Sequence, residues 1–223
     1  MSNFLVLLGD FYHPADRVGS FLAPLLEEAP VRLTVLTDPA AFPWDTLDEW
    51  DGLLIARDAL LAEDGRRTDR LWCPPERQSR LSAFVQEGGG LLAVHSGIAQ
   101  YPAGEAYRRL TKGVFTHHPP GALPLTVHPL NLRHPVMDGV GEWTTEDELY
   151  CVQRDPDAPE PLAELVSSEH GSSPAVWAHE AGRGRVCVLT PGHTEATWTH
   201  PSMRRLLYNA LSWTARTSRI QEE

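Results

Sequence analysis

The feature that most constrains the fold is a stretch from Gln86 to Gly97, in which three glycines lead into a short apolar run that ends on a histidine. An amphipathic segment precedes it, and residues 98–110 have the composition of a second helix. The order helix, glycine turn, buried strand, sharp corner and helix is typical of open α/β sheets. In such sheets the corner lies above the carboxyl end of a parallel strand, where ligands bind. A side chain at this corner should therefore face a ligand crevice.

The corner is best aligned on His95. In nucleophile-elbow enzymes small residues stand two positions before and after the apex, because strand and helix approach closely there. In the frame from Ala93 to Gly97 both flanking positions are small and His95 is the apex. Centring the frame on Ser96 would put Ile98 at the last small position, so Ser96 is the weaker candidate for a nucleophile.

Other apolar runs predict the remaining elements. Continuous apolar runs bounded by turn residues predict buried parallel strands at residues 4–8, 31–36, 52–56 and 185–190. Further strands are expected at residues 123–128 and 162–167, and antiparallel edge strands at 149–153 and 175–179. Helices are expected at residues 16–29, from Pro74 onward and at 201–215, with a short helical turn at 46–50.

Two segments look irregular. Residues 59–73 are charged and read as a surface excursion, and residues 113–150 carry many prolines, which predicts an extended connection around the crevice. The whole pattern indicates one α/β domain over residues 1–215, of the flavodoxin-like three-layer α/β/α kind. Its central sheet should be mostly parallel with antiparallel edge strands, and residues 216–223 should form a frayed tail.

Composition narrows the function. The 223 residues carry a formal charge of −11, which repels phosphate backbones and anionic membranes, so neither nucleic acid nor a membrane is an expected partner. Three unpaired cysteines fit a reducing compartment, and the first residues lack the pattern of a signal peptide. We therefore expect a cytoplasmic protein. The sequence leaves the oligomeric state open, with a homo-oligomer as one option.

Histidines are the most informative polar residues. His95 and His193 each follow an apolar strand directly, and His13 lies in the loop after the first strand. In a parallel sheet these side chains would meet at the carboxyl edge. Two imidazoles can perform acid/base catalysis near neutral pH, or bind a divalent metal such as zinc if a third ligand joins them. The candidates for that third partner are His118, His13, Asp147 and Glu148.

Six segments in order carry a family resemblance: Gly88–Gly97, Tyr107–Leu110 with Phe115–Pro119, His134-Pro135 with Gly139, Asp147–Tyr150, Gly182–Val186 and Gly192-His193. Over nearly its whole length the chain resembles ThuA-like proteins, a family named for trehalose utilisation and similar in fold to class I glutamine amidotransferases. Those enzymes carry a cysteine at the elbow and a late His-x-Glu. By this resemblance His193 is the base and Glu195 its orienter, but His95 replaces the cysteine. A thiolate mechanism therefore has no nucleophile here, and we expect no glutaminase activity.

The resemblance implies carbohydrate metabolism, with trehalose or related glucosides and their 3-keto forms as the substrate class. On this hypothesis His95, His193 and Glu195 are catalytic, and His95, His193 and His118 are the candidate metal ligands. His13, His118, Asp147, Glu148 and Tyr150 would contact the sugar. Two alternatives stay open: a non-catalytic module that binds a sugar or a protein, and an esterase or amidase that uses Ser96 with His193.

Overall fold

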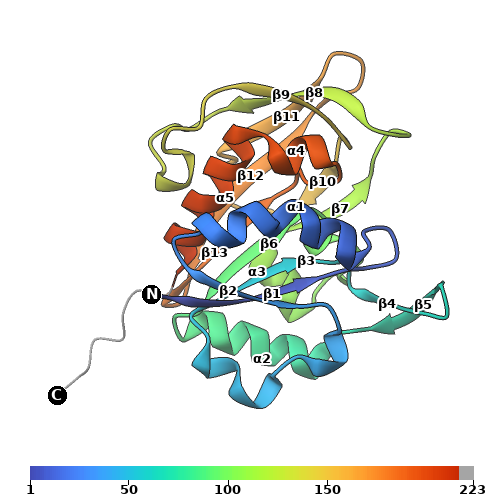
Figure 1. The fold of residues 1–223 in the computed structure, drawn as a ribbon, viewed down its shortest axis with the longest axis vertical. Coiled ribbons are helices and arrows are strands. Elements are labelled where there is room, and N and C mark those ends of the chain that lie inside the picture. Colours follow the sequence, from blue (N-terminus) through green and yellow to red (C-terminus); the bar gives the residue numbers. More distant parts are fainter. Residues whose placement is uncertain (216–223) are drawn as a thin grey trace.

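The computed structural model describes residues 1–215, with the side chains of residues 25–28 left out. The predicted frayed tail, residues 216–223, lies outside the described part of the chain. A nine-stranded sheet runs through the molecule (Figure 1). In sheet order its strands are β2 (Arg32–Leu36), β1 (Asn3–Leu8), β3 (Gly52–Ala56), β6 (Gly90–Val94), β13 (Gly184–Leu189), β12 (Gly171–Ala181), β11 (Ala163–Ser167), β8 (Leu123–Pro129) and β9 (Trp143–Asp147).

The sheet has a parallel and an antiparallel half. The strands from β2 to β13 pair in parallel, in the order 2-1-3-4-5 of flavodoxin-like sheets. From β13 to β9 every pairing is antiparallel. The predicted flavodoxin-like α/β fold is confirmed, but the antiparallel part is a four-stranded extension rather than isolated edges. Strand β12, expected at an edge, lies inside the sheet between β13 and β11.

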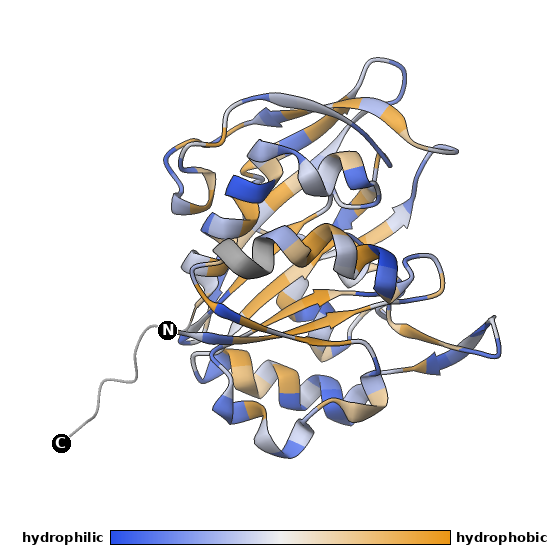
Figure 2. Ribbon diagram, viewed as in Figure 1, coloured by the Kyte–Doolittle hydropathy of each residue, from blue (hydrophilic) through white to orange (hydrophobic). Residues whose placement is uncertain are grey.

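Helices cover both faces of the sheet, which gives the expected three layers. Helices α1 (Ala15–Glu28), α4 (Glu195–Thr199) and α5 (Pro201–Thr214) pack their apolar side chains on one face. Helices α2 (Pro75–Gln86) and α3 (Ala106–Thr111) pack on the other. The central strands are the most hydrophobic part of the molecule (Figure 2), because they are buried on both faces. Within residues 1–215, no helix has both the length and the apolar character that crossing a membrane requires.

The corner after β6 has the shape that the sequence predicts. His95 has a φ of 48° and begins a 3₁₀ turn, η3 (His95–Ile98). At Gly97 a Cβ atom would lie 2.2 Å from the carbonyl oxygen of Ile55, so β3 leaves no room for a side chain. The helix expected over residues 98–110 is wrong in its first half, since α3 begins only at Ala106. Pro102 and Gly104 occupy the intervening loop and disfavour a helix there.

Two short sheets lie outside the main one. The expected irregular excursion at residues 59–73 is in fact a hairpin of β4 (Leu60–Glu63) and β5 (Arg66–Leu71). Its turn residues, Asp64 and Gly65, both have positive φ, as two-residue hairpin turns require. The second sheet pairs β7 (Gly113–His117) with β10 (Cys151–Arg154). The remaining short turns are η1 (Pro39–Ala41), η2 (Trp44–Glu49), which contains most of the predicted turn at 46–50, and η4 (Pro135–Met137).

Candidate functional site

Polar side chains gather at the carboxyl edge of the parallel strands. His13 follows β1, His95 comes directly after β6 and His193 follows β13, while Glu148 comes directly after β9 from the antiparallel half. These residues meet beside a cavity of about 310 Å³. Its lining residues are Tyr12, His13, Asp58, Arg67, Ser96, Ala99, Gln100, Phe115, His118, Glu148, Tyr150 and His193.

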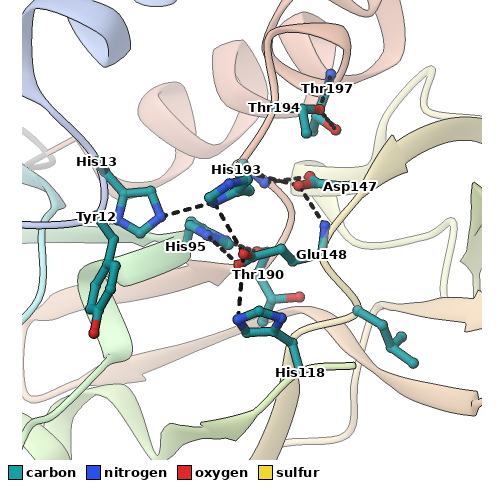
Figure 3. Close-up of polar contacts among 12 residues, drawn as sticks. Tyr12, His13, His95, His118, Asp147, Glu148, Thr190, His193, Thr194 and Thr197 are labelled. Carbon is teal, nitrogen blue, oxygen red and sulfur yellow. Dashed lines mark hydrogen bonds and ion pairs between the residues drawn. The ribbon is translucent and has the colours of Figure 1, made fainter. Parts of the chain in front are cut away.

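The side chains of four residues from different elements converge on one point (Figure 3). One nitrogen or oxygen atom from each of His13, His95, Glu148 and His193 lies within 4.8 Å of the other three. The Nε2 atom of His13 is 3.1 Å from Nδ1 of His193. The Glu148 carboxylate lies between the other rings, with Oε1 3.4 Å from His193 Nδ1 and Oε2 3.4 Å from His95 Nε2.

Hydrogen bonds behind the cluster fix two of the rings. Nδ1 of His13 lies 2.8 and 3.0 Å from the two carboxylate oxygens of Asp10, and Nδ1 of His95 lies 2.8 Å from the carbonyl oxygen of Thr190. Because a carbonyl or carboxylate oxygen only accepts, each Nδ1 carries the proton and donates it. In the neutral rings each Nε2 atom then carries a lone pair and points into the cluster, where that of His13 lies 3.1 Å from Nδ1 of His193. Nε2 of His95 is buried and has no well-formed hydrogen bond within residues 1–215.

Asp147 holds the site together from behind. Its carboxylate accepts backbone N–H bonds from Gly192 (2.8 Å), His193 (2.9 Å) and Glu148 (2.9 Å). The residue is completely buried and does not line the cavity. The structure therefore places Asp147, expected to contact substrate, as the anchor that ties the loop after β13 to the end of β9.

His118 and Tyr150, the other expected contacts, do line the cavity. Nδ1 of His118 lies 2.7 Å from its neighbour's carbonyl oxygen at Pro119, and its Nε2 is 3.4 Å from Glu148 Oε1. The ring of Tyr150 stacks on Phe115 and lies 4.2 Å from the ring of His95. His118 stands beside the four-residue cluster rather than in it, and His13 takes the place that the sequence assigned to His118.

Glu195 and Ser96 are placed differently from the sequence hypotheses. Glu195 begins α4 with its side chain exposed, and the carboxylate that contacts the His193 ring is that of Glu148. Ser96 is buried near Asp10, whose pKa it helps to lower, and within residues 1–215 its hydroxyl group makes no hydrogen bond with His193. The contacts thus bring together His95, His193, His13 and Glu148, but not the Glu195–His193 or Ser96–His193 pairs.

Comparison with known proteins now identifies the family. The family model described as trehalose utilisation, ThuA, matches residues 3–214. The chain belongs to the ThuA family. No functionally curated protein matches it.

Solved structures show the same fold at low identity. A ThuA-like protein from Parabacteroides merdae is 15% identical, with 99% of this chain and 93% of that one aligned and a TM-score of 0.74. A ThuA-like protein from Bacteroides uniformis (18% identity, 96% and 91% aligned, TM-score 0.70) and a cytoplasmic protein of Salmonella typhimurium (15%, 97% and 100%, 0.71) are also similar. The fold also matches 31% of a β-galactosidase from Rahnella sp. R3 (13% identity, 95% of this chain, 0.63).

The ionisable side chains of this ThuA site have shifted pKa values. Burial would lower the pKa of His95, but Glu148 and Asp147 outweigh it and raise that pKa. Burial likewise favours the neutral form of His193, and its pKa stays below the usual value despite Glu148. The pKa of Glu148 is lowered, because the surrounding histidines overcome the effect of its burial. Glu148 is therefore ionised, while the pKa values of His95 and His193 are shifted in opposite directions.

Behind the cluster, two carboxyl groups differ sharply. Burial alone would raise the pKa of Asp10, but His13, Ser96 and the backbone of Asp58 bring it well below its usual range. Burial and the nearby charge of Asp10 raise the pKa of Asp58 to about 6. Asp10 is therefore ionised and orients His13, as carboxylates behind metal-bound histidines do.

Sequence reasoning missed several residues of the ThuA site. Asp10 and Asp58 each follow an apolar strand, the same signal that singled out His95 and His193. Thr190 contributes only a backbone oxygen, which carries no sequence signal. Arg67 reaches the cavity because residues 60–71 form a hairpin, and the Asp64-Gly65 turn could have predicted that hairpin.

Proposed function

We propose that this ThuA-family chain is a metal-dependent enzyme of carbohydrate metabolism. In this proposal His13, His95 and His193 bind a divalent ion such as zinc, with Glu148 as the fourth ligand. The observation that carries it is the orientation of the rings: Nδ1 donors on His13 and His95 are committed to Asp10 and Thr190, so the Nε2 lone pairs face a shared point. Metal-ligating histidines show this arrangement almost always.

The spacing of the cluster supports the proposal. A tetrahedral zinc site with metal–nitrogen bonds of about 2.0–2.1 Å has its ligand atoms roughly 3.3–3.4 Å apart. Three of the interatomic distances are close to this value: 3.1 Å between His13 and His193, and 3.4 Å from Glu148 Oε1 to His193 and from Oε2 to His95. All four ligand atoms lie within 4.8 Å of one another. One carboxylate among the three imidazoles also suits the charge of a divalent ion.

The chemistry proposed for the site is Lewis-acid activation of a sugar. A metal bound by these four ligands would polarise a carbonyl, or lower the pKa of a hydroxyl group or water, that joins it as a fifth ligand. His118, whose Nε2 faces the Glu148 carboxylate, stands where a proton donor or acceptor is needed. We infer trehalose-type glucosides or their 3-keto forms as the substrate class from the family's description. A cytoplasmic location fits the name of the Salmonella protein.

Metal content of the purified chain tests the proposal. Wild-type protein should carry about one divalent ion per chain, and His95→Ala should lose at least about tenfold in metal affinity, because one ligand of the set is gone. The measurement is elemental mass spectrometry on untagged protein after equilibration with zinc. His128→Ala is the matched control, since His128 is an exposed histidine that pairs with Glu142 outside the site.

Two results would contradict the proposal. One is no stoichiometric metal in the wild type after equilibration. The other is equal metal content in the wild type and His95→Ala. Turnover of glucosides and keto-sugars by the loaded enzyme, lost in His95→Ala, is the second readout, and sugar binding without any turnover would favour a non-catalytic module instead.

A further inference from the structure

The lining of the cavity also includes a carboxylate and a guanidinium that the metal proposal does not use. Asp58 lies two residues after the end of β3, and Arg67 lies in β5, where the β4–β5 hairpin brings it to the same cavity as His13 and His193. Neither residue belongs to the four-residue cluster. Both are therefore available to a ligand that the cluster activates.

Asp58 and Arg67 can each make a further hydrogen bond to a ligand. Asp58 is 3% exposed, and its Oδ1 accepts the N–H of Leu60 at 2.9 Å. Its Oδ2 lies 3.8 Å from Nη2 of Arg67, which is too long for a hydrogen bond. The Nε atom of Arg67 is buried and has no hydrogen-bond partner within residues 1–215. A buried donor without a partner costs about 1–3 kcal/mol, so such a group is usually explained by a missing ligand or water.

Both side chains are held in place. Arg67 lies over the ring of Tyr12, with its Cζ 5.3 Å from the ring centroid, and its Nη1 donates to the Tyr12 hydroxyl at 3.3 Å. The backbone N–H of Asp58 donates to Oδ2 of Asp10 at 3.0 Å, and Asp10 also fixes the ring of His13. The carboxylate on the cavity wall and the proposed metal ligand therefore share one anchor.

We propose that Asp58 and Arg67 form a subsite for two neighbouring hydroxyl groups of a neutral sugar. A hydroxyl group both donates and accepts, so one hydroxyl can donate to the Asp58 carboxylate while its neighbour accepts from Arg67. A carboxylate or phosphate would gain from Arg67 but would be repelled by Asp58, so the pair selects against anions. The cavity lies at the small end of ligand sites, which are about 300–1,000 Å³, and this favours a single sugar ring. The inference rests on the proposed function, because it assigns the orientation of the sugar at that site.

The experiment compares sugar binding with metal binding in the same variants. Methyl α-D-glucopyranoside and trehalose are titrated into the zinc-equilibrated protein by calorimetry at pH 8. Arg67→Met and Asp58→Asn should each weaken binding about tenfold or more, because each leaves a buried partner or a sugar hydroxyl unpaired. Their zinc content should equal that of the wild type. Arg70→Met is the matched control: Arg70 lies in the same strand, is exposed and pairs with Glu63, so its affinity should stay within about twofold.

The outcomes separate this inference from the proposed function. The subsite is overturned if both variants bind the two sugars within about twofold of the wild type. It is also overturned if the metal-loaded wild type binds neither sugar, or if gluconate or glucose 6-phosphate binds tighter than the neutral glucoside. Sugar binding that depends on Arg67 in a protein without bound metal would support the subsite and contradict the metal proposal. Loss of zinc from Arg67→Met would show that this residue acts on the cluster, and would overturn its assignment to the sugar.

Discussion

At the scale of single residues, the site depends on the partners behind its imidazoles. Asp10 bonds Nδ1 of His13 with both carboxylate oxygens, and it also accepts the backbone N–H groups of Tyr12, His13 and Asp58. This carboxylate is the reason that His13 presents Nε2 to the cluster. A neutral amide at this position would hold the ring less firmly and would make Nδ1 a possible acceptor.

Asp10→Asn should therefore weaken zinc binding without removing a ligand. We expect the affinity to fall about 10–100-fold, which is the usual effect of losing a partner behind a metal-bound histidine. Competition with a chromogenic chelator measures it, and Asp16→Asn, at an exposed residue in the first turn of α1, is the control. Zinc affinity within about threefold of the wild type would show that Asp10 does not orient His13 for a metal.

At the scale of elements, the corner between β6 and η3 positions His95. The backbone of Gly97 passes so close to β3 that a Cβ atom would meet the Ile55 carbonyl oxygen at 2.2 Å. That oxygen belongs to a central strand paired on both sides, so it has little freedom to move. The corner is therefore a rigid support for the imidazole.

Gly97→Ala should destabilise the protein by roughly 2–4 kcal/mol, because relieving the clash must displace either the corner or β3. Urea unfolding followed by circular dichroism measures the change. Gly65→Ala is the control for side-chain crowding: Gly65 has open space around its Cβ position, although its positive φ still costs some strain. Equal stability of Gly97→Ala and the wild type would mean that the corner relaxes easily.

The sequence predicted some elements well for a physical reason. The parallel strands β1, β3, β6 and β13 are continuous apolar runs, because both of their faces are covered by helices. Strands β7 and β9 were missed. In β9 two of the three buried positions are polar, Thr145 and Asp147, so the segment has no apolar alternation and reads as an extended connection. The site residues were likewise predicted only in part. His95 and His193 were found from strand ends, whereas the sharing of one point by His13 and Glu148 depends on sheet register, which no local pattern encodes.

At the scale of the whole molecule, stability should depend on a histidine far from the site. Burial, with a smaller effect of Lys112, lowers the pKa of His179 in β12 to about 4. Between pH 6.5 and 4 the unfolded chain binds a proton at this residue and the folded chain does not. Acidification through this range therefore favours unfolding, while above pH 6.5 the titration of this residue adds no pH dependence to stability.

His179→Leu should remove this part of the pH dependence. The free energy of unfolding of the wild type should fall by as much as about 3 kcal/mol more than that of the variant between pH 7.5 and pH 4.5. Urea titrations at both pH values give the comparison, with His170→Leu as the control at an exposed histidine. Parallel losses in the wild type and His179→Leu would assign the acid sensitivity to other groups.

The proposed ligands would also make the stability of the fold depend on the metal. His13 and His193 are 180 positions apart in sequence, and their ring nitrogens are 3.1 Å apart in space. An ion bound to both would join two segments that lie far apart in the sequence. The folded chain alone brings these two ligands together, so an ion that binds only the folded state adds its binding free energy to stability. Metal supply would then govern the lifetime of the folded protein as well as its chemistry.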